Sequence, residues 1–237
     1  MKFAIIIPTY RRNDGKTIEF LERSIDSIFS QTYQKFKIFL IGDKYDNESE
    51  VYNLIEKYDK LKIFFKNLKI AKERDIYDDK WAIWSYGGVN ATNVGIEYAI
   101  DENFDFICHL DHDDWWFDNH LEEIKKCIDK TKCDWMCTKS TYRNINTHFP
   151  PIQTNEKYLE FLPTPERVIH SSVCFNIKTL PLRYVDIFTI EGKSGLPADA
   201  YLWKRQNKYI RDNNLKSILI NTLTCNHLEE GYTRNNI

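Results

Sequence analysis

Short apolar runs alternate with helical patterns through the first half of this 237-residue chain. The runs are rich in Ile and Phe and have the length of buried strands; they are Phe3 to Ile7, Phe36 to Ile41, Leu61 to Phe65 and Phe104 to Leu110. Between them, apolar residues recur on one helical face over 18–29 and again over 51–58. Right-handed crossovers join parallel neighbours in this way, so the pattern predicts an α/β fold with a mostly parallel central sheet flanked by helices.

The second half is less regular. A helix is predicted over about 90–101, after Gly87 and Gly88, and another around 121–128. Later elements are expected as strands at 134–138, 173–177 and 217–224, and as a helix from about Pro197 to Asp212. Residues 139–170 contain four of the seven prolines and show no period, which predicts long loops over one end of the sheet.

Charge and hydropathy exclude several classes of partner. With 33 basic and 35 acidic side chains the net charge is -2, so no global positive field favours nucleic acid or anionic lipid. The first apolar run ends at Pro8, too early for the core of a signal peptide, and no stretch reaches the ~18 apolar residues of a membrane helix. We expect one domain over 1–237 in the cytoplasm, with peripheral contact to a membrane-bound acceptor left open.

The six cysteines form no CxxC pair. A zinc site built from Cys127, Cys133 and Cys137 has unusual spacing, so buried free thiols are the favoured interpretation.

Polar residues follow the first two strands at the edge where open parallel sheets bind ligands. After the first strand, the Thr9 hydroxyl could meet a ligand, Tyr10 could stack on a base, and Arg11 or Arg12 could reach phosphate. Asp43 follows the second strand and could accept a hydrogen bond from a base or a ribose. An ordinary exposed loop at the first position and a turn-forming aspartate at the second are the alternatives.

The stretch CHLDHDDWW places three carboxylates directly after the fourth strand, at Asp111, Asp113 and Asp114. In an extended segment Asp111 and Asp113 point the same way, while His112 points to the opposite side. Neighbouring carboxylates repel each other unless a cation or a proton lies between them. Oxygen ligands favour Mg²⁺ or Mn²⁺ completed by water and phosphate. The alternative is a solvated acidic turn that caps the following helix.

Five segments of the chain resemble inverting glycosyltransferases of the family 2 type. They are IIIPTYRR at 5–12, LERSIDSIFSQTY at 21–33, IGDKYD at 41–46, GGVNATNVGIEYA at 87–99 and LDHDDWWFDNHL at 110–121. The chain departs from the family pattern at Gly42, where the family has a first acid, and at Asp118, where it has a proline. The resemblance implies a single-domain, Rossmann-like GT-A fold with a smaller acceptor-side sheet. It also implies a nucleotide-sugar-binding half at about 1–114 and an acceptor and catalytic half at about 115–237.

The resemblance also implies roles for residues of the first half. Donor-binding residues would be Pro8, Thr9, Tyr10, Arg12, Asp43, Asn93, Asp111 and His112. Among these, Thr9, Tyr10 and Asp43 would hold the base and Asp111 the ribose. Asp111 and Asp113 would hold Mn²⁺ or Mg²⁺ together with the diphosphate, and His227 is a candidate third ligand.

The catalytic base of the family is an acid at a helix start in the second half. LPADAYLWKRQ at 196–206 matches that element and assigns the role to Asp199, although Ala198 replaces the common glutamate. Without the resemblance, Asp199 is simply a helix-capping acid. His170 precedes a strand expected to line the acceptor side, and its part stays open.

The implied function is metal-dependent, inverting transfer of a sugar from a nucleotide-diphosphate donor, UDP by family habit, to a hydroxyl of a glycan or other acceptor. Two alternatives remain open. One is retaining sugar transfer or nucleotidyl transfer on the same fold, and the other is a non-catalytic module that binds a nucleotide-sugar or glycan.

Overall fold

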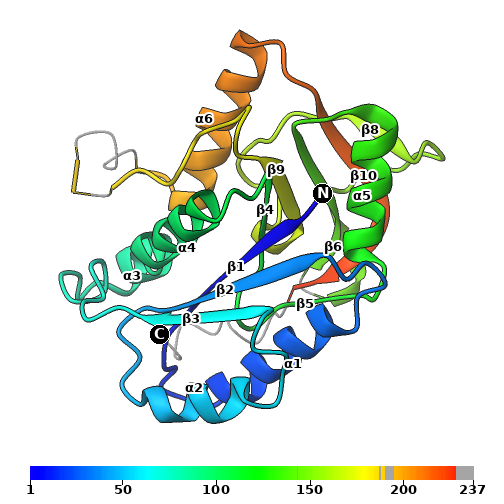
Figure 1. The fold of residues 1–237 in the computed structure, drawn as a ribbon. Helices are drawn as coiled ribbons and strands as arrows, with labels where there is room; N and C mark the ends of the chain where they lie inside the picture. Colours follow the sequence, from blue (N-terminus) through cyan, green and yellow to red (C-terminus); the bar gives the residue numbers. More distant parts are fainter. Residues whose placement is uncertain (143, 187, 190–194, 228–237) are drawn as a thin grey trace.

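A ten-stranded curled sheet runs through the protein in the order β3-β2-β1-β4-β9-β6-β10-β5, with β7 paired to β6 and β8 to β10 (Figure 1). The computed structural model describes residues 1–142, 144–186, 188–189 and 195–227. The strands are β1 Phe3–Thr9, β2 Phe36–Gly42, β3 Ile63–Asn67, β4 Phe106–His109, β5 Trp115–Trp116, β6 Trp135–Tyr142, β7 Asn144–Phe149, β8 Tyr158–Glu160, β9 Val173–Asn176 and β10 Ser217–Asn226. The helices are α1 Thr17–Phe29, α2 Glu48–Ile55, α3 Lys80–Tyr86, α4 Val89–Asp101, α5 His120–Thr131 and α6 Ala198–Asp212, with a 3₁₀ turn η1 at His170–Ser172.

The first four strands of the order are parallel, as the strand-helix alternation predicts. Helices α1, α2 and α5 pack on one face of the sheet, and α4 and α6 pack on the other (Figure 1). Strand β1 lies between both layers, so Phe3, Ile5 and Ile7 face one core while Ala4 and Ile6 face the other. A strand buried on both faces requires an uninterrupted apolar run, which is what the sequence shows there.

Close packing of α4 on the sheet depends on a glycine. A Cβ atom added to Gly95 would lie 2.7 Å from Cγ2 of Ile6, so α4 approaches β1 more closely than a side chain at this position allows. That approach sets where the amino end of α4 lies relative to the end of β1.

The second half of the sheet is mixed rather than parallel. Strand β9 is antiparallel to both β4 and β6, and β10 is parallel to β6. The smaller strands β7 and β8 join this same sheet at its second-half side. The prediction of long loops over 139–170 was wrong in part, because β6 extends to Tyr142 and pairs with β7.

The six cysteines are free and buried. The sulfur atoms of Cys127 and Cys133 lie 3.7 Å apart in the core under α1 and α5, whereas Cys137 belongs to the core on the opposite face. A zinc site that joins these three residues is therefore not formed.

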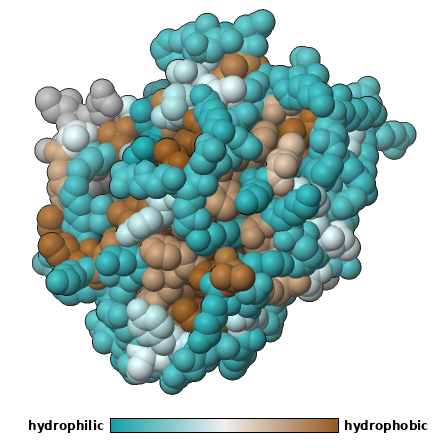
Figure 2. Space-filling view, in the orientation of Figure 1, coloured by the Kyte–Doolittle hydropathy of each residue, from teal (hydrophilic) through white to brown (hydrophobic). Residues whose placement is uncertain are grey.

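The surface seen in Figure 2 is largely hydrophilic and broken by several apolar patches. Within the described part of the chain, no helix combines the length and apolar character that a membrane crossing requires.

Candidate functional site

The ends of β1, β2 and β4 meet at one edge of the sheet, because Thr9 pairs in register with Gly42 and β4 runs beside β1. A cavity opens there, with about 470 Å³ of empty space when its open mouth is included. It is lined by Pro8, Thr9, Tyr10, Asp43, Arg74, Gly87, Gly88, Asp111, His112 and Asp113. Seven of the residues assigned from the sequence to the donor or the metal thus surround one space, although they come from three separate segments.

Two oxygen atoms in this cavity lack a hydrogen-bond partner. Oγ1 of Thr9 and Oδ1 of Asp43 are buried, and neither forms a hydrogen bond with the described residues. Buried polar atoms are nearly always paired in folded proteins, and an unpaired one costs about 1–3 kcal/mol. Both residues line the same cavity, where a ligand with a hydrogen-bond donor for Asp43 and a partner for the Thr9 hydroxyl would satisfy them.

The other side of Asp43 is held by Arg74, a residue that the sequence analysis missed. Nε of Arg74 donates to Oδ2 of Asp43 at 3.1 Å, and the guanidinium lies 3.4 Å from the centroid of the Tyr10 ring. Burial raises the pKa of Asp43, and the charge of Arg74 opposes that rise. Arg74 lies in a turn beyond β3 with no motif around it, so only the fold brings it to Asp43.

Gly42 departs from the family pattern for a steric reason. A Cβ atom at Gly42 would lie 2.4 Å from Oδ1 of Asn67, the oxygen that accepts the backbone N–H of Tyr45 at 2.8 Å. An acid at Gly42 would displace this contact, and the loop that carries Asp43 would move with it.

Helix α1 holds the acidic turn from one side. The Ser24 hydroxyl is shared between the carbonyl oxygens of His112, at 2.8 Å, and Asp114. About two turns further along, just beyond the end of α1, Nε2 of Gln31 donates to the carbonyl of Phe117 at 2.7 Å. The motif LERSIDSIFSQTY therefore acts as a scaffold for the carboxylates, since its polar residues bind the backbone of the turn.

Turn η1 holds the same segment from the other side. Oγ of Ser171 accepts the backbone N–H of Asp111 at 3.0 Å and donates to Oδ2 of Asp114 at 2.6 Å. Its carbonyl accepts Nε1–H of Trp116 at 2.7 Å. The neighbouring ring of His170 contacts Oδ1 of Asp111 through Nδ1 at 2.9 Å. The acidic turn is thus fixed by residues about 60 to 90 positions away in sequence.

The carboxyl groups of the turn differ in protonation. Burial raises the pKa of Asp111, but His170, His227 and His112 together outweigh burial and hold that pKa well below its usual range. The pKa of Asp113 is raised to about 7, first by burial and then by the charges of Asp114 and Asp111. Nη1 of Arg12 donates to Asp113 at 3.0 Å and offsets this rise only in part.

The turn fits a divalent cation as an open, oxygen-only site. Asp111 and Asp113 both line the cavity, and the raised pKa of Asp113 reflects negative charge that a cation would offset. Across residues 1–142, 144–186, 188–189 and 195–227, however, no three His, Cys, Asp or Glu side chains gather into a metal-binding group. The remaining ligands would come from water and a bound diphosphate, as Mg²⁺ and Mn²⁺ commonly take them.

His227 pairs with Asp114 instead of facing the cation site alone. Its Nδ1 lies 3.0 Å from both carboxylate oxygens of Asp114. Burial lowers the pKa of His227, but Asp114 outweighs burial and raises it to about 9. The imidazole is therefore cationic at neutral pH, and metal binding through it would require loss of that proton. Its role as a ligand stays a prediction.

The other residues assigned to the donor have well-defined surroundings. His112 is buried with its ring edge-on to Tyr10, 5.0 Å between centroids, and burial lowers its pKa to about 4. Asn93 lines neither this cavity nor the adjoining one. Its amide pairs twice with the backbone of Tyr184, at 3.0 and 3.1 Å. Donor binding by Asn93 stays a prediction, and its visible contacts hold the 184 segment against α4.

A second cavity, with about 640 Å³ of empty space when its open mouth is included, adjoins the first and shares Asp111 with it. Asp199 lines it from the first turn of α6, together with Trp84 of α3 and the side chains of His170 and Tyr184. Burial raises the pKa of Asp199, while His170 opposes the rise. The fold thus places the predicted base in a cavity next to the predicted donor site. His170, whose part the sequence left open, lines this cavity, whereas Tyr184 carries no local motif and is revealed only by its neighbours in space.

The comparisons with known proteins agree with this architecture. The family model described as glycosyl transferase family 2 matches residues 4–189. An uncharacterized glycosyltransferase, R139, of Acanthamoeba polyphaga mimivirus is 34% identical over 99% of this chain and 97% of its own. The amylovoran biosynthesis glycosyltransferase AmsB of Erwinia amylovora is 25% identical over 55% of this chain and 36% of its own.

Two solved structures share the fold. S. aureus TarS 1-349 in complex with UDP-GlcNAc has a TM-score of 0.67 at 17% identity, with 99% of this chain and 61% of that chain covered. The mannosyltransferase PcManGT from Pyrobaculum calidifontis in complex with GDP-Man and Mn²⁺ has a TM-score of 0.65 at 14% identity, with 98% and 58% covered. The chain spans about 60% of the length of these solved chains. On the family match and the mimivirus relative, the chain belongs to glycosyl transferase family 2 and is a glycosyltransferase.

Proposed function

We propose that the enzyme transfers a sugar from a nucleotide-diphosphate donor, with UDP as the carrier, to a hydroxyl of a glycan or other acceptor, and that the anomeric configuration is inverted. The observation that carries the proposal is the pair of buried, unpaired oxygens of Thr9 and Asp43 in the first cavity. The N3–H of a uracil would satisfy Asp43, and the Thr9 hydroxyl can donate to a uracil carbonyl oxygen. TarS with UDP-GlcNAc, a structure of the same fold, supports UDP as the carrier.

The donor would lie across the end of the sheet. Tyr10 offers a ring for stacking, Asp43 accepts a hydrogen bond from the base, the Thr9 hydroxyl donates one to it, and Asp111 accepts from the ribose at the junction of the cavities. Asp111 and Asp113 would hold Mn²⁺ or Mg²⁺, and when bound the ion supplies positive charge against the diphosphate. The PcManGT complex with Mn²⁺ supports this assignment.

Asp199 would act as the general base. The acceptor O–H bond breaks as its oxygen bonds to the anomeric carbon, the proton passes to the Asp199 carboxylate, and the bond from that carbon to the diphosphate oxygen breaks. Burial raises the pKa of Asp199, which makes the carboxylate a stronger base than a solvated aspartate. The electron pair of the broken bond leaves with the nucleoside diphosphate.

The exposed ring of Trp84 supports a glycan as the acceptor. Trp84 lines the same cavity as Asp199 and is 44% exposed, so an accessible indole borders the space that holds the expected base. Aromatic faces are common in small-molecule pockets whose few polar groups set orientation.

The test is transfer from UDP-, GDP- and dTDP-sugars to a panel of glycan acceptors, with and without MnCl₂. We expect Asp199→Asn to abolish transfer while UDP affinity stays within about threefold of wild type, because the base takes no part in donor binding. NMR of the product should show the inverted anomer. A retained anomer would indicate the retaining alternative, and release of a sugar 1-phosphate would indicate nucleotidyl transfer. UDP binding without turnover on any acceptor would indicate a non-catalytic module.

A further inference from the structure

His170 links a donor-site carboxylate to a phenol of the acceptor-side cavity. Its Nδ1 lies 2.9 Å from Oδ1 of Asp111, and its Nε2 lies 2.7 Å from the hydroxyl of Tyr184. A carboxylate only accepts, so Nδ1 carries the proton in the first bond. The phenol donates or accepts as required and satisfies Nε2 in either protonation state. Both ring nitrogens are therefore engaged, and the ring has one orientation.

The face of the His170 ring is supported as well. The ring of His109 stacks on it at 4.4 Å between centroids and 26° between planes, and His109 is fully buried at the end of β4. Neither ring nitrogen of His109 forms a hydrogen bond with the described residues. Strand β4 thus supplies a flat support beneath His170 that leaves its two nitrogens to Asp111 and Tyr184.

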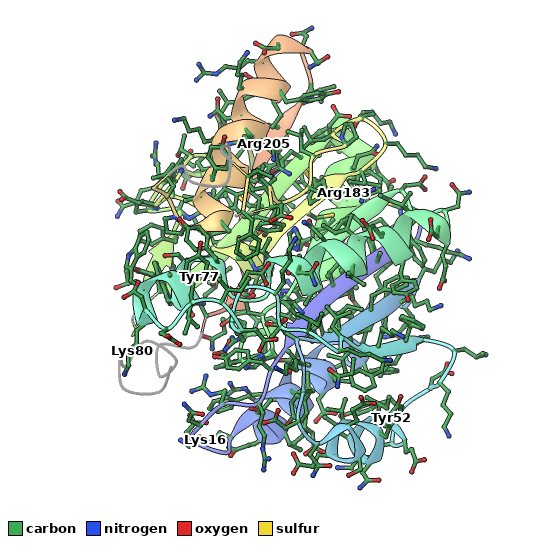
Figure 3. The ribbon with its side chains drawn as sticks, turned by 90° about the vertical axis from the view of Figure 1, so that its left-hand side faces the viewer. Lys16, Tyr52, Tyr77, Lys80, Arg183 and Arg205 are labelled. Carbon is green, nitrogen blue, oxygen red and sulfur yellow. The ribbon has the colours of Figure 1, made fainter. Side chains whose placement is uncertain are left out.

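Tyr184 is itself anchored from two helices. Asn93 of α4 pairs with its backbone, and the neighbouring Arg183 extends to Glu97 of α4 at 2.7 Å. From α6, Nη1 of Arg205 donates to the carbonyl of Arg183 at 2.8 Å, and Figure 3 shows these two arginines on neighbouring segments. The phenol that holds His170 is therefore part of the packed structure rather than a loose side chain.

This arrangement leaves one oxygen of Asp111 for a ligand. Oδ1 is engaged by His170, the backbone N–H by Ser171, and Oδ2 forms no hydrogen bond with the described residues. Asp111 lines both cavities, so its second oxygen lies where the donor and acceptor spaces meet. Rotation about the bond to the carboxyl group would exchange the two oxygens if Oδ1 were released.

We propose that His170 is a positioning residue of the donor site, which holds Oδ1 of Asp111 so that the other carboxylate oxygen is presented to the donor nucleotide. The inference rests on the proposed function, because it takes Asp111 as a donor ligand. His170 acts through Asp111 and does not touch the reacting atoms.

The test compares two amides that each replace one nitrogen of the ring. In His170→Asn the side-chain amide takes the place of Nδ1 and retains a donor to Asp111, whereas in His170→Gln it takes the place of Nε2 and retains only the contact to Tyr184. The affinity of the tightest-binding of UDP, GDP and dTDP is measured with MnCl₂ by calorimetry. Loss of a hydrogen bond to a charged group weakens binding by roughly 10-fold or more. We expect nucleotide affinity to fall by roughly 10-fold or more in His170→Gln and to stay within about threefold of wild type in His170→Asn.

A purely structural role would weaken both variants alike, and equal affinities for the two would overturn the inference. If wild-type protein bound none of the three nucleotides, the proposed function would fail and the inference with it. Should His170→Gln not fold, ¹⁵N NMR of the wild-type imidazole decides. We expect a proton on Nδ1, and a neutral ring with its proton on Nε2 alone would refute the bond to Asp111.

Discussion

Glu73 is a buried carboxyl that makes stability depend on pH. It is 1% exposed in the turn after β3, and its Oε1 accepts the backbone N–H of Asn90 at the start of α4 at 3.1 Å. Its Oε2 is buried and has no hydrogen-bond partner among the described residues. Burial, followed by the nearby charge of Asp43, raises the pKa of Glu73 from 4.5 to about 7. The folded protein therefore retains a proton that the unfolded chain has already lost.

The raised pKa of Glu73 sets the size and the sign of the change in stability with pH. At 1.36 kcal/mol per pH unit, the interval between pKa 4.5 and about 7 corresponds to about 3 kcal/mol. This stability is present below pH 4.5 and is lost as the pH rises through the folded-state pKa near 7. Glu73→Gln cannot ionise, yet its amide oxygen still accepts from Asn90. We therefore expect the free energy of unfolding of the variant, minus that of wild type, to rise by about 3 kcal/mol between about pH 4 and pH 8.5.

Urea unfolding followed by circular dichroism at a series of pH values measures this difference directly. The control is Glu56→Gln, which removes an exposed carboxyl and should follow wild type at every pH. The raised pKa of Glu73 would be refuted if the free energy of unfolding of Glu73→Gln, minus that of wild type, stayed constant to within about 0.5 kcal/mol from about pH 4 to pH 8.5. The buried carboxyl would then titrate as it does in the unfolded chain.

Three further perturbations test the scaffold and the two cavities. Ser24→Ala leaves the carbonyl of His112 without its donor, and a loss of about 1–3 kcal/mol in urea unfolding is expected, with Ser30→Ala as an outer-face control. Arg74→Ala removes the cation from Asp43 and should weaken UDP binding by roughly 10-fold in calorimetry; unchanged affinity would contradict this role. Trp84→Ala should raise the KM for a glycan acceptor several-fold and leave UDP affinity unchanged, whereas equal effects on both would count against an acceptor role.

The sequence predicts the first half of the fold well because periodicity there reports burial directly. Strand β1 reads as a continuous apolar run since both of its faces are covered, and α1 repeats apolar residues on one face. Helix α3 was missed because Trp81 and Trp84 are about half exposed, so it has no apolar stripe facing the core. Strands β7 and β8 were missed because one is largely polar and the other has only three residues.

In the candidate site, too, residues at strand ends could be predicted better than residues in turns. The placement of Thr9, Asp43 and Asp111 at one edge of the sheet could be predicted because each lies at or just after the end of a buried strand, and parallel strands end at one edge. Arg74 could not be predicted, since it comes from a turn without a motif, and for His170 the sequence did not show the contact to Asp111, since it comes from a single 3₁₀ turn. The charge of His227 could not be predicted from the sequence either. It depends on the contact with Asp114, which only the fold creates.

The acidic turn is secured by both α1 and η1, which are more than 140 residues apart in the chain. During synthesis on the ribosome, the aspartates therefore emerge well before Ser171, which completes their hydrogen bonds. A fragment that stops at residue 114 would contain the carboxylates but lack half of their support. Separate expression of the two halves should consequently give nucleotide binding only after they associate, and the enzyme is a poor candidate for splitting at that point.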